Sequence, residues 1–351
     1  MTEPRYLIPG DYSADPAAHV FGGRLFVYPS HDRDAGIPER DNGDHFDMVD
    51  YHAYEILPGA DGKIDPMKGE VVDHGVILRL EDVPWASRQL WDSDVAEKDG
   101  RYYLYFSARD RAGSFRIGVA VAERPEGPFV AEPEPIRGSY SIDPCCFADP
   151  KTGARYLAFG GLWGGQLQRY RGNRQVHSAE EDTLPDGVRC ALEPADGEPA
   201  LSAKLVRLSD DMKSFAEEPR DLLILDEGGE PVRAGDHARR FFEASWLCFK
   251  DGLYSFSYST GDTHLLCEAV SETVEGPYRY RGELLGPQVG WTTHHCLTEI
   301  EGRWYLFHHD SAPSGGRTWL RSLKVAPLPL PFLARSKNSP ASLFCAVRAR
   351  D

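Results

Sequence analysis

The sequence predicts an all-β protein that forms a single domain, a five-bladed β-propeller. Short runs rich in Tyr, Phe, Leu and Val recur along the 351 residues, and the 34 glycines and 26 prolines separate them, which is typical of antiparallel strands. Five of these runs follow a similar turn, and a ten-residue motif occurs twice. A small sheet cannot bury both faces alone, so five related sheets stacked around an axis are favoured. A β-sandwich with unrelated hairpins is the alternative.

The first repeat is a tight turn that leads into a strand. It occurs at 21–28, 98–105, 151–158, 250–257 and 301–308. Dipeptides such as Asp-Gly and Gly-Gly adopt the positive φ of a two-residue hairpin. We therefore expect another strand before each turn, paired with the strand after it.

The second repeat supports the same unit. Residues 120–129 and 269–278 are identical at six of ten positions and end in a Glu-Gly-Pro turn after a third strand. We predict blades at 11–75, 88–130, 139–215, 240–283 and 290–326, with long insertions at 30–50 and 172–199. Residues 327–351 are rich in proline and basic residues and are expected to form an atypical tail after the propeller.

Charge and composition exclude several classes of function. The formal net charge is −16, so nucleic acid and anionic membrane surfaces are unfavourable partners. The first residues carry neither a basic nor an apolar segment, and no apolar run is long enough to span a membrane. The seven cysteines show no Cys-x-x-Cys pair. We expect a cytoplasmic protein with reduced thiols. The sequence leaves open whether the protein forms a homo-oligomer.

The first strand of every predicted blade opens with polar residues in apolar surroundings. These residues are Asp15, Asp92 and Asp94, Asp143, Glu243, and His294 and His295. Equivalent positions of a radial repeat form a ring, so we expect these side chains to meet at one mouth of the central channel. For any single acid, a role in shaping a turn is the alternative.

Facing carboxyl groups in a cleft suit cleavage of a glycosidic bond. One carboxylic acid protonates the leaving oxygen while a carboxylate activates water. We select Asp15, Asp143 and Glu243, because a third acid raises the pKa of the proton donor by repulsion between like charges. Glu243 follows Phe241 and Phe242, and this apolar setting favours its protonated form.

These segments resemble glycoside hydrolase family 43, and most closely its bacterial β-xylosidase-like members. The resemblance extends from about residue 9 to residue 325 and rests on the segments 9–16, 42–47, 83–86, 138–144, 160–168, 241–246, 258–264 and 290–295. It implies that 1–326 form the catalytic domain of an inverting enzyme. Asp15 would be the general base, Asp143 the residue that tunes and orients the acid, and Glu243 the general acid.

The resemblance also implies further site residues. His294 would lie near a divalent ion, expected to be calcium, with His295 as second choice, although a channel residue without metal is the alternative. Arg321 would contact the sugar or make a surface salt bridge. Phe46, Trp85 and Trp163 would be platforms for the sugar or core residues, and His45 and Asp44 would line the subsite. In blade two, Asp94 would hold the family's usual acid position and Asp92 would be additional.

The resulting expectation is an exo-acting β-xylosidase that releases terminal xylose from β-1,4-xylo-oligosaccharides. An α-L-arabinofuranosidase acting on arabinose-substituted oligosaccharides is the close alternative. A non-catalytic sugar-binding propeller would lack a member of the acidic trio, and an interaction scaffold would have a bare channel. The proline-rich tail departs from the family's pattern and leaves completion of the last blade open.

Overall fold

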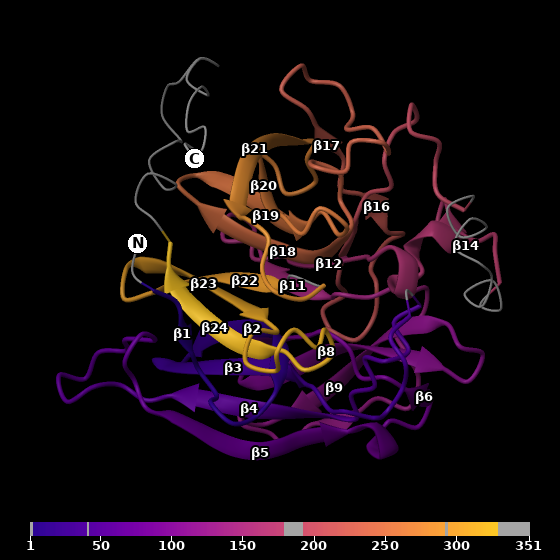
Figure 1. The fold of residues 1–351 in the computed structure, drawn as a ribbon. Helices are drawn as coiled ribbons and strands as arrows, with labels where there is room; N and C mark the ends of the chain where they lie inside the picture. The colour runs from indigo at the N-terminus through magenta and orange to yellow at the C-terminus, as the bar shows by residue number, and fades with distance from the viewer. Residues whose placement is uncertain (1–2, 41, 179–191, 292–293, 329–351) are drawn as a thin grey trace.

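Five antiparallel sheets are arranged around a central axis (Figure 1). The computed structural model describes residues 3–40, 42–178, 192–291 and 294–328. The first strand of each blade contacts the first strand of the next, and the fifth contacts the first. The predicted propeller fold is thereby confirmed.

Each blade consists of four strands or more. Blade one contains β2 (Ser13–Phe21), β3 (Arg24–His31), β4 (Asp50–Ile56) and β5 (Val71–Arg79). Blade two contains β7 (Ser93–Lys98), β8 (Arg101–Asp110), β9 (Phe115–Ala122) and β10 (Val130–Ala131), with β6 (Ala86–Arg88) also paired to β8. Blade three contains β11 (Cys145–Ala148), β12 (Arg155–Phe159), β15 (Lys204–Arg207) and β16 (Arg220–Asp221).

The last two blades have their outer strands supplied from elsewhere in the chain. Blade four contains β18 (Glu243–Lys250), β19 (Leu253–Ser259), β20 (Leu266–Ser271), β21 (Tyr278–Leu285) and the parallel strand β17 (Ile224–Leu225). Blade five contains β22 (His295–Ile300), β23 (Arg303–Asp310), β24 (Ser322–Pro327) and β1 (Arg5–Tyr6). Outside the blades lie η1 (Leu80–Asp82), η2 (Trp163–Gly165), η3 (Leu167–Arg169), β13 (Tyr170–Arg171) and β14 (Arg174–Gln175).

The N-terminal segment completes blade five. Arg5 pairs with Val325 and Tyr6 with Lys324, so the outer strand of the last blade comes from the start of the chain. Predicted blade five, 290–326, omitted this strand. Leu328 donates its backbone N–H to Trp304, and residues 329–351 lie outside the described residues, so the expected tail remains a prediction.

The predicted hairpin turns have the expected backbone. Both central residues have positive φ in Gly22-Gly23, Asp99-Gly100, Asp251-Gly252 and Glu301-Gly302. The turn of blade three is longer, because β11 ends at Ala148 and β12 begins only at Arg155. Within the described ranges, no helix has the length and apolar composition required to cross a membrane.

Candidate active site

Backbone irregularities at the inner strands direct the acids into the channel. The pairing of β2 with β3 shifts between Ala14 and Ala17, and that of β18 with β19 shifts between Glu243 and Trp246. Such bulges turn side chains away from the regular alternation of a strand. Asp15 and Asp143 also have φ values of 52° and 59°, which non-glycine residues rarely adopt away from functional sites.

One pocket at the mouth of the channel contains all three predicted acids. Asp15, Asp143 and Glu243 line it together with Asp92, His294 and Arg321. Its aromatic residues are Phe46, Trp91, Trp163, Phe242 and Trp291. Trp163 stacks on Trp291 with ring centroids 5.3 Å apart. Five of the seven residues expected in the ring, Asp15, Asp92, Asp143, Glu243 and His294, therefore converge on one site, whereas Asp94 and His295 do not line it.

Asp15 is held by Arg321 and His309. Arg321 Nη1 donates to Asp15 Oδ1 at 2.8 Å, and the backbone N–H of Asp15 donates to His309 Nδ1 at 3.1 Å. Burial raises the pKa of Asp15, and the charge of Arg321 opposes this rise. Asp15 therefore depends on Arg321 to be ionised, as a general base must be.

Asp143, two residues before β11 of blade three, connects β8 of blade two with β18 of blade four. Its Oδ2 accepts a hydrogen bond of 2.6 Å from the backbone N–H of Ala244, and its own N–H donates to Ser107 Oγ at 3.2 Å. Burial, followed by the charge of Asp92, raises the pKa of the Asp143 carboxyl group. Asp143 thus fixes the backbone beside Glu243.

Glu243 has the properties of a proton donor. Burial, followed by the charge of Asp92, raises its pKa to about 8. Its Oε1 is buried and has no hydrogen-bond partner among the described residues. A carboxyl group that stays protonated near neutral pH can donate to a leaving oxygen.

Asp92, which the resemblance left as an additional acid, belongs to the site. It lines the pocket, and its Oδ1 lies 3.4 Å from His294 Nε2. Asp94 lies away from this pocket: it contacts His19 Nε2 at 2.5 Å and accepts a hydrogen bond of 2.6 Å from the N–H of Cys146. Asp94 therefore joins blades one, two and three, and its expected role as the acid of this position is corrected.

Asp15, Asp92 and His294 could hold a divalent cation. One ligand atom from each lies within 4.8 Å of the others. Both ring nitrogens of His294 are buried without a hydrogen-bond partner in the described part of the chain, which is costly for a polar ring unless a ligand is present. The donor set fits a cation whose shell is completed by water. His295, the second choice, instead contacts Ser257 Oγ at 2.6 Å and lies outside this group.

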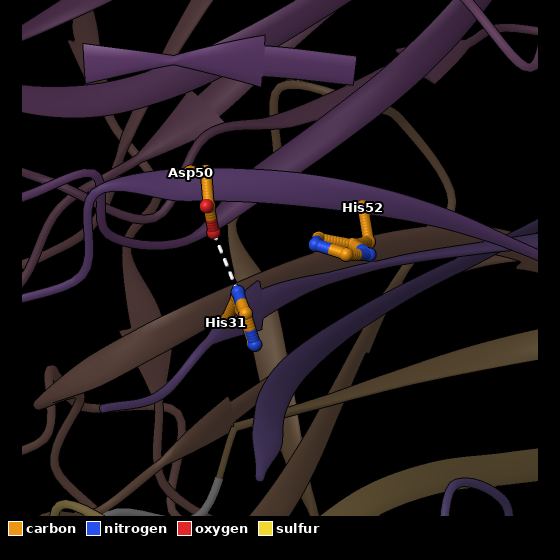
Figure 2. A group of neighbouring side chains, drawn as sticks. All are labelled: His31, Asp50 and His52. Atoms are coloured by element: carbon orange, nitrogen blue, oxygen red, sulfur yellow. Dashed lines mark hydrogen bonds and ion pairs between the residues drawn. The ribbon is translucent and has the colours of Figure 1, made fainter. Parts of the chain in front are cut away.

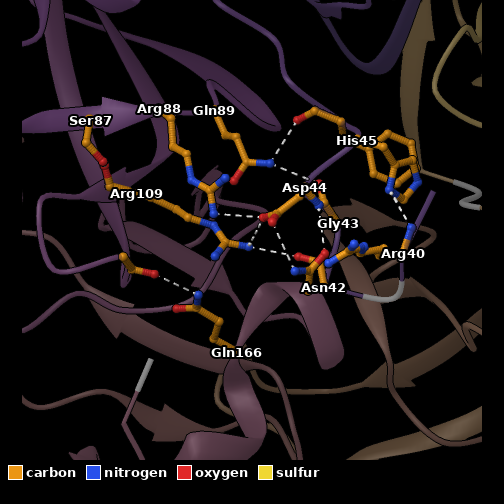
Figure 3. A network of polar contacts seen from close by, with 12 residues as sticks. Arg40, Asn42, Gly43, Asp44, His45, Ser87, Arg88, Gln89, Arg109 and Gln166 are labelled. Atoms are coloured by element: carbon orange, nitrogen blue, oxygen red, sulfur yellow. Dashed lines mark hydrogen bonds and ion pairs between the residues drawn. The ribbon is translucent and has the colours of Figure 1, made fainter. Parts of the chain in front are cut away.

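The segment after β3 brings Phe46 and His45 to the pocket, and a polar network fixes it (Figure 3). Arg88 Nη2 donates to Asp44 Oδ1 at 2.7 Å. Gln89 Nε2 donates to the backbone oxygens of Gly43 and Phe46. Asp44 is therefore part of this network, and its expected place along the subsite is not observed.

Trp85 does not line the pocket. Its ring stacks on Phe106 at 5.9 Å, within the hydrophobic core of blades one and two. A Cβ at Gly118 would come within 2.7 Å of the Trp85 ring, so a glycine is needed at that contact. The packing corrects the expectation that Trp85 is a sugar platform.

Sequence reasoning missed several residues of the site. Asp32 accepts hydrogen bonds from Arg321 Nε and Nη2, and Trp91 and Trp291 form part of the pocket wall. Trp91 directly precedes Asp92, and Trp291 lies within the segment 290–295 that resembles the family. These two positions in the sequence could have identified both tryptophans as site residues.

A buried Glu243 with a raised pKa and an Asp15 paired with a buried arginine lie in one pocket with aromatic walls, which is the arrangement of an acid/base hydrolase of glycosidic bonds. The comparisons agree. Residues 72–186 match the model of glycosyl hydrolases family 43. The chain is 57% identical over 327 residues to a xylosidase/arabinosidase of Bacteroides ovatus, covering 93% of this chain and 94% of that protein.

Two solved structures share the fold. RS223-β-xylosidase is 58% identical and superposes with a TM-score of 0.85, covering 93% of this chain and 95% of that one. A β-xylosidase/α-arabinofuranosidase from a compost microbial metagenome, in complex with xylotriose and in calcium-free form, is 49% identical with a TM-score of 0.85 and the same coverage. The chain belongs to glycoside hydrolase family 43, an inverting family, and is a glycoside hydrolase of the β-xylosidase type.

Proposed function

We propose that this protein removes terminal xylose from short β-1,4-xylo-oligosaccharides with inversion of the anomeric carbon. The observation that carries the proposal is the pairing of a protonated Glu243 with an Asp15 held by Arg321 in one pocket. The complex of the metagenomic relative with xylotriose supports the substrate class. The complete acidic trio disfavours a non-catalytic sugar-binding propeller.

The two acids divide the reaction between them. Glu243 donates its proton to the glycosidic oxygen while the bond from this oxygen to the anomeric carbon breaks. Asp15 takes a proton from a water molecule whose oxygen forms the new bond to the anomeric carbon from the other face. The products are a shortened chain, whose new hydroxyl group carries the proton from Glu243, and a xylose of inverted configuration, whose new hydroxyl group comes from water. Asp15 then releases its proton to solvent and Glu243 takes one up, so the net reaction consumes one water molecule.

The remaining charged residues position these two. Asp143 holds the backbone at Ala244, next to Glu243, and Arg321 keeps Asp15 ionised and oriented. We propose calcium as the cation of the Asp15, Asp92 and His294 group, which would hold it together with water. When bound, this cation supplies positive charge that favours ionised carboxylates nearby.

Contacts between blades one and five support an exo mode. Thr318 Oγ1 donates to Glu39 Oε1 at 3.1 Å, and Arg317 Nη1 lies 3.4 Å from Asp34 Oδ2. Glu39 and Phe46 from the same segment line the pocket. We propose that this segment closes one side of the pocket, which would favour a chain end over a chain interior. The cytoplasmic location expected from the sequence remains a prediction and is consistent with short soluble substrates.

The test is hydrolysis of an aryl β-D-xylopyranoside and an aryl α-L-arabinofuranoside side by side, each with EDTA or with added calcium. We expect dominant xyloside cleavage that falls in EDTA and recovers with calcium. Proton NMR of the first product should show the α-anomer of xylose. Dominant arabinofuranoside cleavage would instead favour the second candidate, which the combined name of the Bacteroides ovatus relative supports.

A further inference from the structure

A second cluster of histidine and carboxylate side chains lies on blade one, apart from the residues that line the active-site pocket. His31, Asp50 and His52 each offer one ligand atom within 4.8 Å of the other two. Figure 2 shows these three side chains directed into the same space beside strands β3 and β4. This cluster takes no part in the proposed hydrolysis.

The strand register brings the three residues together. Strands β3 and β4 are antiparallel with Ser30 opposite Tyr51, and the same register places His31 opposite Asp50. His52 lies two residues after Asp50, where the pairing of β4 with β5 is irregular on both sides of His52. The His52 side chain nevertheless points into the space that His31 and Asp50 share (Figure 2).

Two further carboxylates orient the imidazole rings. His52 Nδ1 lies 3.0 Å from Asp73 Oδ1 on β5, which leaves Nε2 of His52 available to a ligand. His31 Nδ1 lies 2.5 Å from Asp50 Oδ1, and His31 Nε2 lies 3.4 Å from Asp11 Oδ1. A carboxylate on the second nitrogen of a histidine is the arrangement that fixes the ring orientation in metal sites.

The charge and exposure of the cluster suit a divalent cation. Asp11, Asp50 and Asp73 contribute three negative charges, and Arg79 Nη1, the opposing cation, lies 3.8 Å from Asp50 on an exposed side chain. The side chains of His31, Asp50 and His52 are 26%, 12% and 14% exposed, so the site is partly desolvated but open to solution.

We propose that His31, Asp50 and His52 bind one divalent transition-metal ion of the zinc type. Two imidazole nitrogens and one carboxylate oxygen are ligands that zinc prefers, whereas calcium requires six to eight oxygens. Tetrahedral zinc separates its ligand atoms by roughly 3.3 Å, given bond lengths of about 2 Å. The His31 to Asp50 contact would open by under about 1 Å, which a partly exposed carboxylate accommodates by rotation.

The position of the cluster gives this ion a structural role. His31 is the last residue of β3 and Asp50 is the first residue of β4, so the two ligands bracket the segment 32–49. That segment contributes Phe46 and His45 to the pocket and Asp32 to the contacts of Arg321. A metal ion would therefore tie together both ends of the segment that shapes the active site.

The experiment is a calorimetric titration of the full-length protein with zinc chloride. The protein is first treated with EDTA and then transferred to EDTA-free buffer. Excess calcium is present throughout, so that calcium occupies the Asp15, Asp92 and His294 group. The wild-type protein is compared with the double variant His31→Ala/His52→Ala. His74→Ala is the matched control, because His74 Nε2 contacts Glu55 Oε2 at 2.9 Å in the same blade but belongs to no three-residue cluster of possible metal ligands among the described residues.

We expect the double variant to bind one zinc ion fewer per chain than the wild type, and the His74→Ala variant to match the wild type. Zinc should raise the Tm of the wild type and of His74→Ala but not of the double variant. Equal zinc stoichiometry in the double variant, or no zinc bound by the wild type, would overturn the proposal.

A second variant guards against misfolding. Circular dichroism and hydrolysis of an aryl glycoside without zinc report whether the double variant folds. If it does not, Asp50→Asn removes one ligand charge at constant shape and should weaken zinc binding about tenfold or more. An unchanged zinc affinity in Asp50→Asn would contradict the proposed ligand set.

Discussion

Arg321 and Asp15 form an ion pair at the centre of the pocket, with Nη1 and Oδ1 2.8 Å apart and both side chains almost fully buried. Arg321 is itself fixed from its other side, where Nε and Nη2 donate to the two oxygens of Asp32. The planar guanidinium therefore bridges two carboxylates at once, which a lysine cannot reproduce. The ionised form of Asp15 depends on a residue whose own position is set by Asp32.

The first prediction concerns Arg321→Lys. An ammonium group cannot donate to both carboxylates in this geometry, so the pKa of Asp15 should rise further and the base should be protonated over a wider range of pH. We expect kcat/KM to fall by about 100-fold, comparable to the loss of one preorganised charge contact, and its acid limb to move to higher pH.

Arg317→Lys is the matched control, because Arg317 lies in the same segment but its side chain is exposed and pairs with Asp34 at the surface. Its kcat/KM should stay within about twofold of the wild type. An Arg321→Lys variant whose acid limb coincides with that of the wild type would show that Asp15 does not need this arginine.

The second prediction tests Glu243 as the proton donor. Glu243→Ala should lose activity on glycosides with poor leaving groups by about 1,000-fold or more, but far less on activated aryl glycosides, which need no protonation. In the wild type, the alkaline limb of kcat/KM should fall near pH 8, because the raised pKa of Glu243 keeps it protonated below that pH.

For activated aryl glycosides this alkaline limb should be absent in Glu243→Ala. Initial rates measured across the pH range for both substrates provide the comparison. Equal losses on poor and activated leaving groups would reject the assignment of Glu243 as general acid.

The sequence was sufficient to predict the inner part of the propeller. The dipeptides Asp99-Gly100 and Asp251-Gly252 adopt positive φ for local steric reasons, so their hairpins could be read without tertiary information. The ring of first strands followed from the repeat. Arg5–Tyr6 could not be assigned as the outer strand of blade five, because a two-residue strand has no periodicity and its pairing with β24 spans nearly the whole chain.

The site was predicted less completely, because it also depends on contacts between residues that are far apart in the sequence. Asp92 and Asp94 are two residues apart in similar surroundings, yet one lines the pocket and the other joins three blades. Asp32 was missed because its function exists only through Arg321, 289 residues further along the chain. A sequence identifies an aromatic residue but does not reveal whether it faces the core or the sugar.

The third prediction concerns stability. The pKa of Glu243 rises from 4.5 to about 8 on folding, so between these pH values the folded protein binds more protons than the unfolded chain and the free energy of unfolding falls as pH rises. Glutamine does not titrate. Glu243→Gln should therefore be more stable than the wild type by up to about 5 kcal/mol above pH 8, with little difference near pH 4.5.

Thermal unfolding in EDTA at several pH values measures this difference, which corresponds to a Tm increase of up to about 7 degrees. Glu39→Gln serves as the control, since Glu39 lines the same pocket but is exposed and accepts a hydrogen bond from Thr318 Oγ1. A constant Tm difference between Glu243→Gln and the wild type at all pH values would contradict the raised pKa.

The last prediction separates the two tryptophans for which we expected the same role. Trp163 lines the pocket and stacks on Trp291, whereas Trp85 packs on Phe106 in the core of blades one and two. Trp163→Ala should raise KM for xylobiose about tenfold, because an apolar platform for the sugar is lost. Trp85→Ala should leave KM unchanged but lower the free energy of unfolding by about 3 kcal/mol, since it creates a cavity.

If Trp85→Ala does not fold, Trp85→Phe keeps part of the packing and should lower Tm at constant KM. Steady-state kinetics and denaturant unfolding of both variants distinguish the roles, and a KM increase in the Trp85 variants would place that ring at the substrate after all.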